Sequence, residues 1–239
     1  MGLLQGVIKA RRLRIDRGGI AYHVLNRRVG RLPLLEKDDD YAAFEKVLDE
    51  AHARGPMRVI SYCLMPNHWH LVLWPTRDGQ LSRYMQWLTT THMRRWHAHR
   101  GSRGTGPVYQ GRFKSFPIQE DRHFVVVCRY VERNALRANL VGRAEDWAWS
   151  SLARRRRKGV ESPWLVALRD WPVEPPRNWR AFVNRAETEG ELEALRRSVA
   201  RGAPYGDAHW QRRTAARLKL ESSLRPPWRS KRGRYGRKK

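Results

Sequence analysis

The sequence predicts an α+β fold in which an antiparallel sheet carries its helices on one face. Short segments that alternate apolar and polar residues, rich in branched and aromatic side chains, predict strands. Amphipathic segments with apolar residues three and four positions apart lie between them and predict helices. Of the 239 residues, 41% are hydrophobic, which is enough for a buried core between these elements.

The first predicted elements are a strand, a helix and a hairpin. Residues 20–26 (IAYHVLN) alternate and predict a strand. Residues 38–51 begin with three aspartates, which favour a helix N-terminus, and this helix stops at a Gly-Pro pair. Two strands follow at 57–64 and 68–74, and the Met-Pro-Asn turn between them predicts that they pair as a hairpin.

The next elements complete the sheet. Apolar residues at helical spacing from Leu81 predict a second helix that ends near residues 97–101. Residues 108–118 predict a strand with a bulge at Gly111, and residues 120–140 predict a third helix. The order β-α-β-β-α-β-α matches a ferredoxin-like arrangement plus one helix. Helices on one face of an antiparallel sheet are the natural packing of such an order.

The net charge of the chain indicates a polyanionic binding partner. The chain has 49 Lys and Arg against 23 Asp and Glu, a formal charge of +26, and such an excess attracts nucleic acid before it attracts a membrane. Residues 1–150 hold 25 basic and 14 acidic side chains, whereas residues 151–239 hold 24 and 9. This change in charge density predicts a domain boundary near residue 150, with a basic extension over 151–239.

The extension is predicted to be mostly helical. Helices at 187–201 and 207–220, separated by Gly-Ala-Pro, resemble a helix-turn-helix in outline, and prolines within 172–176 predict a stiff linker before them. The tail 225–239, with eight basic residues, and a basic run at the start of the extension are predicted to hold DNA phosphates without reading sequence. The basic run consists of Arg154, Arg155, Arg156, Arg157 and Lys158.

Cysteine content and hydropathy exclude several classes of protein. Cys63 and Cys128 lie in apolar runs without a CxxC pair, so we expect buried core residues rather than a zinc finger or a disulfide framework. No apolar stretch approaches the roughly 20 residues that span a bilayer. The N-terminus shows no signal peptide, and we expect a cytoplasmic protein without a membrane partner.

Four residues could carry chemistry. His68 and His70 share one face of a predicted strand, where they could chelate a divalent ion or be partly exposed strand residues, while Trp69 points into the core. Tyr130 and Asn134 lie one turn apart on the third helix. A phenolic oxygen can act as a nucleophile and an amide oxygen as a ligand, but the spacing alone favours a surface tyrosine and a helix-ending asparagine.

The order of these motifs resembles a known family. PNHWH followed by RYVERNALRANLV resembles the HUH single-tyrosine transposases, in which U is a hydrophobic residue, and within them the REP-associated tyrosine transposases of bacteria. The similarity covers residues 10–150 and includes YHVLNR, QGRFKSFPI and DWAWSSL. It continues more loosely through PYGDAHWQRRTAARLKLESSLRP. The resemblance implies the HUH nuclease fold for a catalytic domain over 1–150, and DNA binding by the basic extension over 151–239.

The resemblance also implies a reaction and its residues. His68, His70 and Asn134 match ligands of Mg²⁺ or Mn²⁺, and Tyr130 matches the nucleophile. Tyr109 is a competing nucleophile, but it lies in a predicted strand and lacks the asparagine four positions later. The implied activity is site-specific cleavage and transfer of single DNA strands at hairpin-forming palindromic repeats, through a covalent 5′-phosphotyrosine intermediate.

The implied partners are single-stranded DNA and DNA hairpins, bound by a monomer or a homodimer. Arg112 and Lys114 in the 108–118 strand could hold backbone phosphates or belong to a solvated strand face. One alternative is a regulatory protein that binds DNA hairpins without cleaving them. Another is a rolling-circle replication initiator or relaxase, which often carries a helicase region for which 239 residues leave no room.

Overall fold

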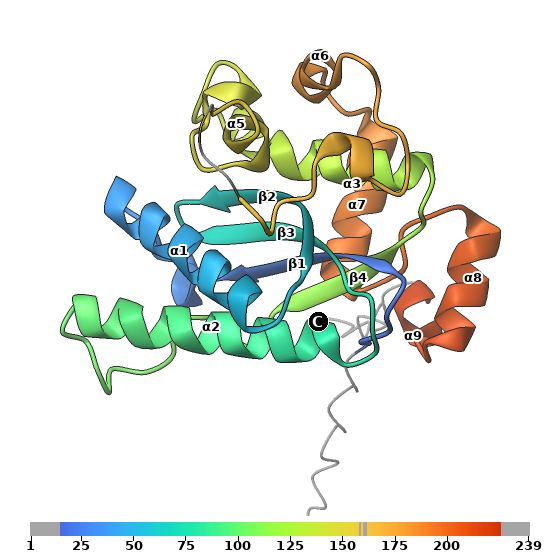
Figure 1. Cartoon of the computed structure of the whole chain (residues 1–239). Helices are drawn as coiled ribbons and strands as arrows, with labels where there is room; N and C mark the ends of the chain where they lie inside the picture. Colours follow the sequence, from blue (N-terminus) through green and yellow to red (C-terminus); the bar gives the residue numbers. More distant parts are fainter. Residues whose placement is uncertain (1–14, 158, 160–161, 226–239) are drawn as a thin grey trace, which may run out of the picture.

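The computed structural model describes residues 15–157, 159 and 162–225 (Figure 1). The strands are β1 (Ala21–Arg27), β2 (Arg58–Met65), β3 (His68–Trp74) and β4 (Lys114–Ile118). The α-helices are α1 (Asp38–Arg54), α2 (Gln80–His99), α3 (Arg122–Glu132), α4 (Asn134–Arg137), α5 (Ser151–Arg154), α6 (Trp179–Asn184), α7 (Glu189–Arg201), α8 (Ala208–Arg217) and α9 (Glu221–Leu224). Short 3₁₀ turns lie at Val29–Arg31, Ala144–Asp146 and Leu168–Asp170.

The four strands form one antiparallel sheet in the order β2-β3-β1-β4. This confirms the predicted α+β class. β2 and β3 form the predicted hairpin, and β1 lies between β3 and β4. The register places Leu25 of β1 opposite His70 of β3 and also opposite Lys114 of β4. Residues from three separate parts of the sequence therefore share one row across the sheet.

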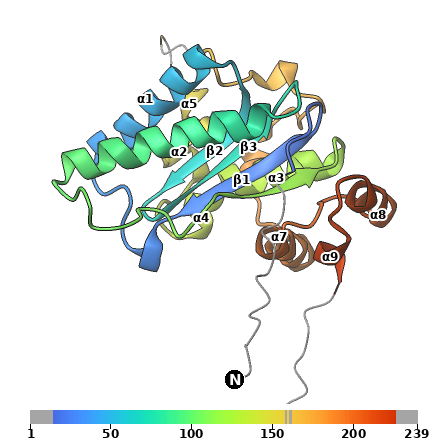
Figure 2. The same cartoon turned by 90° about the horizontal axis from the view of Figure 1, so that it is seen from below.

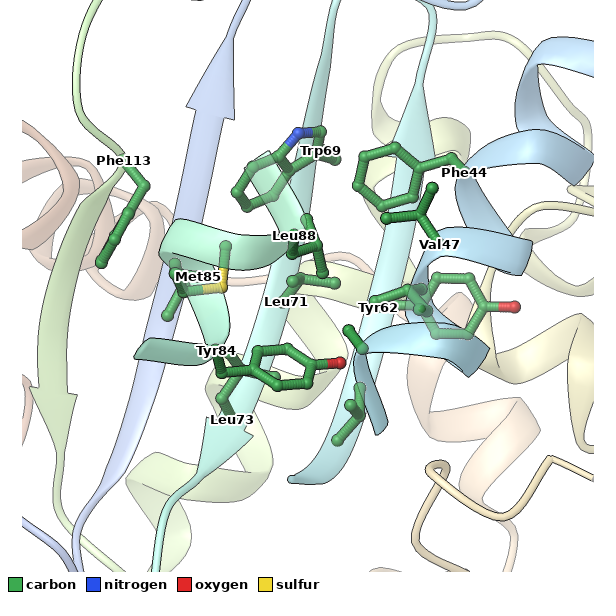
Figure 3. Close-up of a cluster of buried hydrophobic side chains, with 14 of the residues drawn as sticks. Phe44, Val47, Tyr62, Trp69, Leu71, Leu73, Tyr84, Met85, Leu88 and Phe113 are labelled. Atoms are coloured by element: carbon green, nitrogen blue, oxygen red, sulfur yellow. The ribbon is translucent and has the colours of Figure 1, made fainter. Parts of the chain in front are cut away.

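Helices cover both faces of the sheet, which corrects the expectation of helices on one face. α1 and α2 pack on the first face, where Phe44 and Leu88 meet Trp69 in one hydrophobic core (Figure 3). α3 lies on the opposite face, where Phe124 joins a second core with Val72 of β3 (Figure 1). The additional helix is needed there because the central strands carry apolar side chains on both faces.

Two predicted elements are shorter in the structure. The helix predicted over 120–140 is divided at Arg133 into α3 and α4, although Arg133 keeps a helical hydrogen bond to the carbonyl of Arg129 at 2.8 Å. The strand predicted over 108–118 is regular only in β4, with an isolated bridge at Tyr109 before it. The interruption includes Gly111, whose carbonyl accepts a hydrogen bond from Asn26 Nδ2 at 3.2 Å.

The extension packs on the sheet and its helices. Ser150 and Ser151, on either side of the predicted boundary, are fully buried. Trp164 belongs to the first core, and Trp171 and Trp179, at the two ends of the proline-rich stretch, belong to the second. The predicted helices α7 and α8 are present and lie with α9 beside β4, away from α1 (Figure 2). Residues beyond 150 thus complete both cores.

The structure also tests the predictions that the cysteines are buried and that no segment spans a membrane. Cys63 and Cys128 are buried and unpaired, as expected for core residues. Within the part of the chain that the structure describes, no helix is both long and apolar enough to cross a bilayer.

Candidate active site

The two histidines of β3 point toward α3. Trp69 between them lies in the first core, so strand alternation places His68 and His70 together on the other face, as predicted. Their ring centroids are 4.9 Å apart. His68 Nδ1 lies 2.6 Å from the side-chain oxygen of Asn67 in the hairpin turn, so its other nitrogen, Nε2, is left for a further partner.

A third histidine, His23 of β1, completes this cluster and was not among the predicted site residues. Its Nε2 lies 2.8 Å from Nδ1 of His70, and its ring packs on Phe116 at 4.8 Å between centroids. His23 and His70 are diagonal neighbours across the β1–β3 pair, because Leu25 is the residue directly opposite His70. The one feature of the sequence that could have indicated His23 is that it is a polar residue at an inward-facing position of the strand predicted at 20–26.

Tyr130 of α3 lies over the histidines. Its ring meets those of His70 and His23 edge-on, at 6.0 and 6.2 Å between centroids. The side chain is only partly buried, and its hydroxyl has no hydrogen-bond partner among the described residues. Arg137 of α4 also contacts Tyr130, with its guanidinium 4.0 Å from the centre of the Tyr130 ring and 3.2 Å from the Tyr130 carbonyl oxygen.

Asn134 begins α4, directly after the break in the predicted helix. Its side chain is buried, and its Nδ2 has no hydrogen-bond partner in the described part of the chain. The next residue, Ala135, has its backbone N–H bonded to the thiol of Cys63, which lies opposite His70 in the β2–β3 register. The start of α4 is thereby held over the row of the sheet that contains His70.

Burial keeps the three imidazoles neutral. Desolvation is the main cause that lowers the pKa of His23 and of His68 to about 3, with Arg137 adding to it in both cases. The pKa of His70 is well below 6.5, again mainly through burial, with smaller contributions from the two neighbouring histidines. A neutral imidazole has one nitrogen lone pair free, which is the form that binds a metal ion.

The residues present fit a divalent cation with two nitrogen ligands and one oxygen ligand. Within the described ranges, no group of three or more His, Cys, Asp or Glu is arranged to hold a metal, and Nε2 of His23 bonds to His70. Nδ1 of His68 and Nδ1 of His70 are both engaged, so Nε2 of each is available. Nδ2 of Asn134 is buried without a partner, and rotation of the side-chain amide would exchange its nitrogen and oxygen. The oxygen would then occupy that position as the third ligand. Such a ligand set suits Mn²⁺ and, less well, Mg²⁺.

Tyr109, the competing tyrosine, lies on the other face of the sheet. It belongs to the first core, and its hydroxyl lies 3.1 Å from Trp69 Nε1 and 2.8 Å from His92 Nδ1. Burial raises the pKa of Tyr109 above its ordinary value. This tyrosine is separated from the histidine cluster by the sheet itself.

The predicted DNA contacts of the 108–118 segment are exposed. Arg112 and Lys114 both present their side chains to solvent, and neither forms an ion pair with a described residue. Lys114 lies opposite Leu25, in the same row of the sheet as His70 and two strands away from it. Two strand spacings correspond to roughly 10 Å, which is a distance that a DNA strand can bridge.

The basic run after residue 150 is divided between two roles, which corrects part of the prediction. Arg154 forms a buried ion pair with Glu45, and Arg155 pairs with the fully buried Glu132 at 2.6 Å between Nη1 and Oε1. Their charges are neutralised inside the protein, so these two side chains do not face DNA. Arg156 and Arg157 are exposed. Lys158 lies outside the described residues, as does the tail from residue 226.

Carboxylates of the extension hold the segment that carries Tyr130. The side chain of Glu187 is 1% exposed and pairs with Arg137 at 2.7 Å and with Arg133 at 3.3 Å. Glu191, in α7, pairs with Arg129 at 2.6 Å. These arginines are spaced by four residues along the tyrosine segment, so one face of it is fixed to the extension.

The match to a family profile decides the class of this chain. Residues 17–134 match the profile described as "Transposase IS200 like", and they contain the histidines and Tyr130. Residues 17–134 form an IS200-like transposase domain. Membership of a transposase family implies nuclease and strand-transferase activity in general.

One solved structure agrees on the fold. A REP-associated tyrosine transposase bound to a REP hairpin is 20% identical, with a TM-score of 0.50, and the match covers 66% of this transposase and 90% of that chain. A putative transposase from Deinococcus radiodurans R1 is 15% identical over 55% of this chain and 91% of that one, with a TM-score of 0.37. No curated protein matches the chain.

Proposed function

We propose that this transposase cuts and rejoins single DNA strands with Tyr130 as the nucleophile. The observation that carries the proposal is the position of Tyr130. The centroid of its ring lies 6.0 Å from that of His70, and its hydroxyl bonds to no described residue. A phenolic oxygen next to two neutral imidazoles with free nitrogens is the arrangement that metal-assisted attack on a phosphodiester needs.

His68, His70 and Asn134 would hold the cation. When bound, Mg²⁺ or Mn²⁺ supplies positive charge that polarises the scissile phosphate and fixes its orientation. The protein contributes a dry, preorganised site, because His70 and Asn134 are buried and each imidazole nitrogen away from the cation already has a partner.

The covalent step exchanges one phosphodiester for another. Tyr130 Oη attacks phosphorus, the bond from phosphorus to the 3′ oxygen breaks, and the proton that leaves the phenol is finally carried by the new 3′-OH. The products are a 5′-phosphotyrosine and a free 3′ end. A 3′-OH of the same or another strand can attack this ester in the reverse sense, so rejoining needs no ATP. Arg137, stacked on the Tyr130 ring, keeps the nucleophile in place during both steps.

The DNA partner is proposed to be a single strand flanking a hairpin-forming palindromic repeat. The solved relative was bound to a REP hairpin, and two cations of this chain, the exposed Lys114 and the partly buried Arg27, lie in the same sheet as the histidines. Arg27 faces His68 in the β1–β3 register and has no ion-pair partner among the described residues. We place Arg27 and Lys114 at the DNA backbone near the cut, and Arg112, Arg156 and Arg157 further along it.

The test is capture of the covalent product. End-labelled single strands that carry hairpins from the host genome are incubated with the full chain and Mn²⁺ or EDTA, and adducts are resolved on denaturing gels. We expect an adduct that requires Mn²⁺ and disappears in Tyr130→Phe. Tyr84→Phe is the matched control, because the Tyr84 hydroxyl is buried without a partner in the core on the other face.

The possible outcomes separate the candidate functions. An adduct that persists in Tyr130→Phe contradicts the assignment of the nucleophile. Hairpin binding without an adduct in any metal contradicts cleavage altogether and favours a regulatory DNA-binding protein.

A further inference from the structure

His23 has features that a core residue would not need. It is fully buried, and its Nδ1 has no hydrogen-bond partner among the described residues. A buried polar atom without a partner costs about 1–3 kcal/mol, so an apolar ring stacked on Phe116 would fill the same space at lower cost. What His23 supplies instead is a nitrogen 2.8 Å from Nδ1 of His70.

The hydrogen bond between these two rings determines which nitrogen of His70 is free. If Nδ1 of His70 carries the proton and donates it to Nε2 of His23, then Nε2 of His70 keeps its lone pair for a cation. If His23 donates instead, Nε2 of His70 carries the proton and cannot be a ligand. His68 has the same arrangement with a side-chain oxygen, because its Nδ1 faces Asn67 Oδ1 at 2.6 Å.

We infer that His23 is a positioning residue that accepts a hydrogen bond from His70 Nδ1 and so fixes both the orientation and the ligating tautomer of His70. The inference rests on the proposed function, because it needs His70 to be a cation ligand. His23 itself does not face the cation, since its Nε2 is occupied by His70. The surroundings support a fixed ring, because Phe116 packs on one side of His23 and Tyr130 meets it edge-on.

Two variants separate positioning from filling space. His23→Phe keeps a planar ring against Phe116 but removes the acceptor. His23→Gln places an amide oxygen as many bonds from the backbone as Nε2, so it can still accept from His70 Nδ1. Loss of a hydrogen-bond partner behind a ligating histidine typically weakens metal binding by about 10- to 100-fold.

The experiment measures metal affinity and tautomer directly. Free Mn²⁺ is titrated by its EPR signal with the full chain, and long-range ¹H–¹⁵N NMR spectra in saturating Mg²⁺ report which nitrogen of His70 is protonated. We expect His23→Phe to weaken Mn²⁺ binding about 10- to 100-fold and to lose the Nδ1–H form of His70, with its thermal unfolding temperature unchanged or raised. His23→Gln should bind within about three-fold of wild type and keep that form.

Three results would overturn the inference. They are wild-type Mn²⁺ affinity in His23→Phe, equal weakening in both variants, and His70 of the wild type protonated on Nε2. Failure of the proposed function looks different: the wild-type chain would then bind no Mn²⁺ and form no metal-dependent adduct. The inference would still be judged in that case by the tautomer of His70 in the wild type against His23→Phe.

Discussion

Replacing Glu187 by glutamine should loosen the segment that carries Tyr130. The Glu187 carboxylate is 1% exposed and neutralises Arg133 and Arg137, whose side chains are themselves only 14% and 19% exposed. Glutamine keeps the size but removes the charge, so two nearly buried guanidinium groups lose their counter-ion. Removing one partner of a buried pair costs about 3–5 kcal/mol, and since both arginines retain some contact with water we expect about 2–3 kcal/mol.

The same change should slow cleavage more than it weakens DNA binding. Arg137 also stacks on Tyr130 and bonds to its carbonyl oxygen, so an Arg137 without its anchor no longer fixes the nucleophile. A misplacement of about 1 Å can reduce the rate about 100-fold. The assays are urea unfolding, with the slope m checked for constancy, and the rate of adduct formation at saturating DNA.

Glu189→Gln is the matched control for this prediction. Glu189 is 82% exposed and pairs only loosely with Arg196 at 3.5 Å, so its loss should change the free energy of unfolding by less than about 0.5 kcal/mol. If Glu187→Gln unfolds at the urea concentration of the wild type and forms adduct at the same rate, the extension does not hold the tyrosine segment, and the reasoning fails.

Three further predictions address the basic residues and a buried histidine. Replacing Arg156 and Arg157 together by glutamine should reduce the slope of log K for DNA binding against log salt concentration by about 2. This change should cost no more than about 1 kcal/mol of stability, for the exposed hydrogen bond from Arg157 to the Ala148 carbonyl oxygen. Arg154→Gln should instead lower the free energy of unfolding by about 3 kcal/mol, and the reverse pattern would contradict the corrected roles. Arg27→Gln should reduce the rate of adduct formation at least 10-fold with a smaller loss of affinity, and unchanged kinetics would remove this cation from the cleavage site. Burial lowers the pKa of His92 from 6.5 to about 3. Between these two pH values the unfolded chain binds a proton at His92 and the folded chain does not, so the free energy of unfolding falls as the pH drops from 6.5 toward 3. His92→Gln should therefore flatten the loss of stability between pH 7 and 5 by up to about 1.4 kcal/mol per pH unit, and equal slopes in urea unfolding would contradict this.

The local pattern of the sequence was sufficient for much of the sheet and for part of the site. Alternation placed His68 and His70 on one face of β3 with Trp69 in the core, because the side-chain period of a strand does not depend on its neighbours. The helical spacing of Tyr130 and Asn134 held less well, because the helix divides at Arg133 between them. Which tyrosine, Tyr130 or Tyr109, faces the histidines was suggested by resemblance and depends on the packing of whole elements.

The sequence by itself determined the strand and helix periods, the basic excess and the order of the motifs, since these are properties of neighbouring residues. Only the tertiary structure decided that His23 meets His70, because this contact depends on β1 lying beside β3 in one register. It also decided that Arg154 is neutralised by Glu45, a residue 109 positions away, while its neighbour Arg156 stays exposed. Within a run of like charges, the local sequence does not indicate which side chains will pair with a buried counter-ion. That choice is made by the partners that the folded chain brings within a few ångströms.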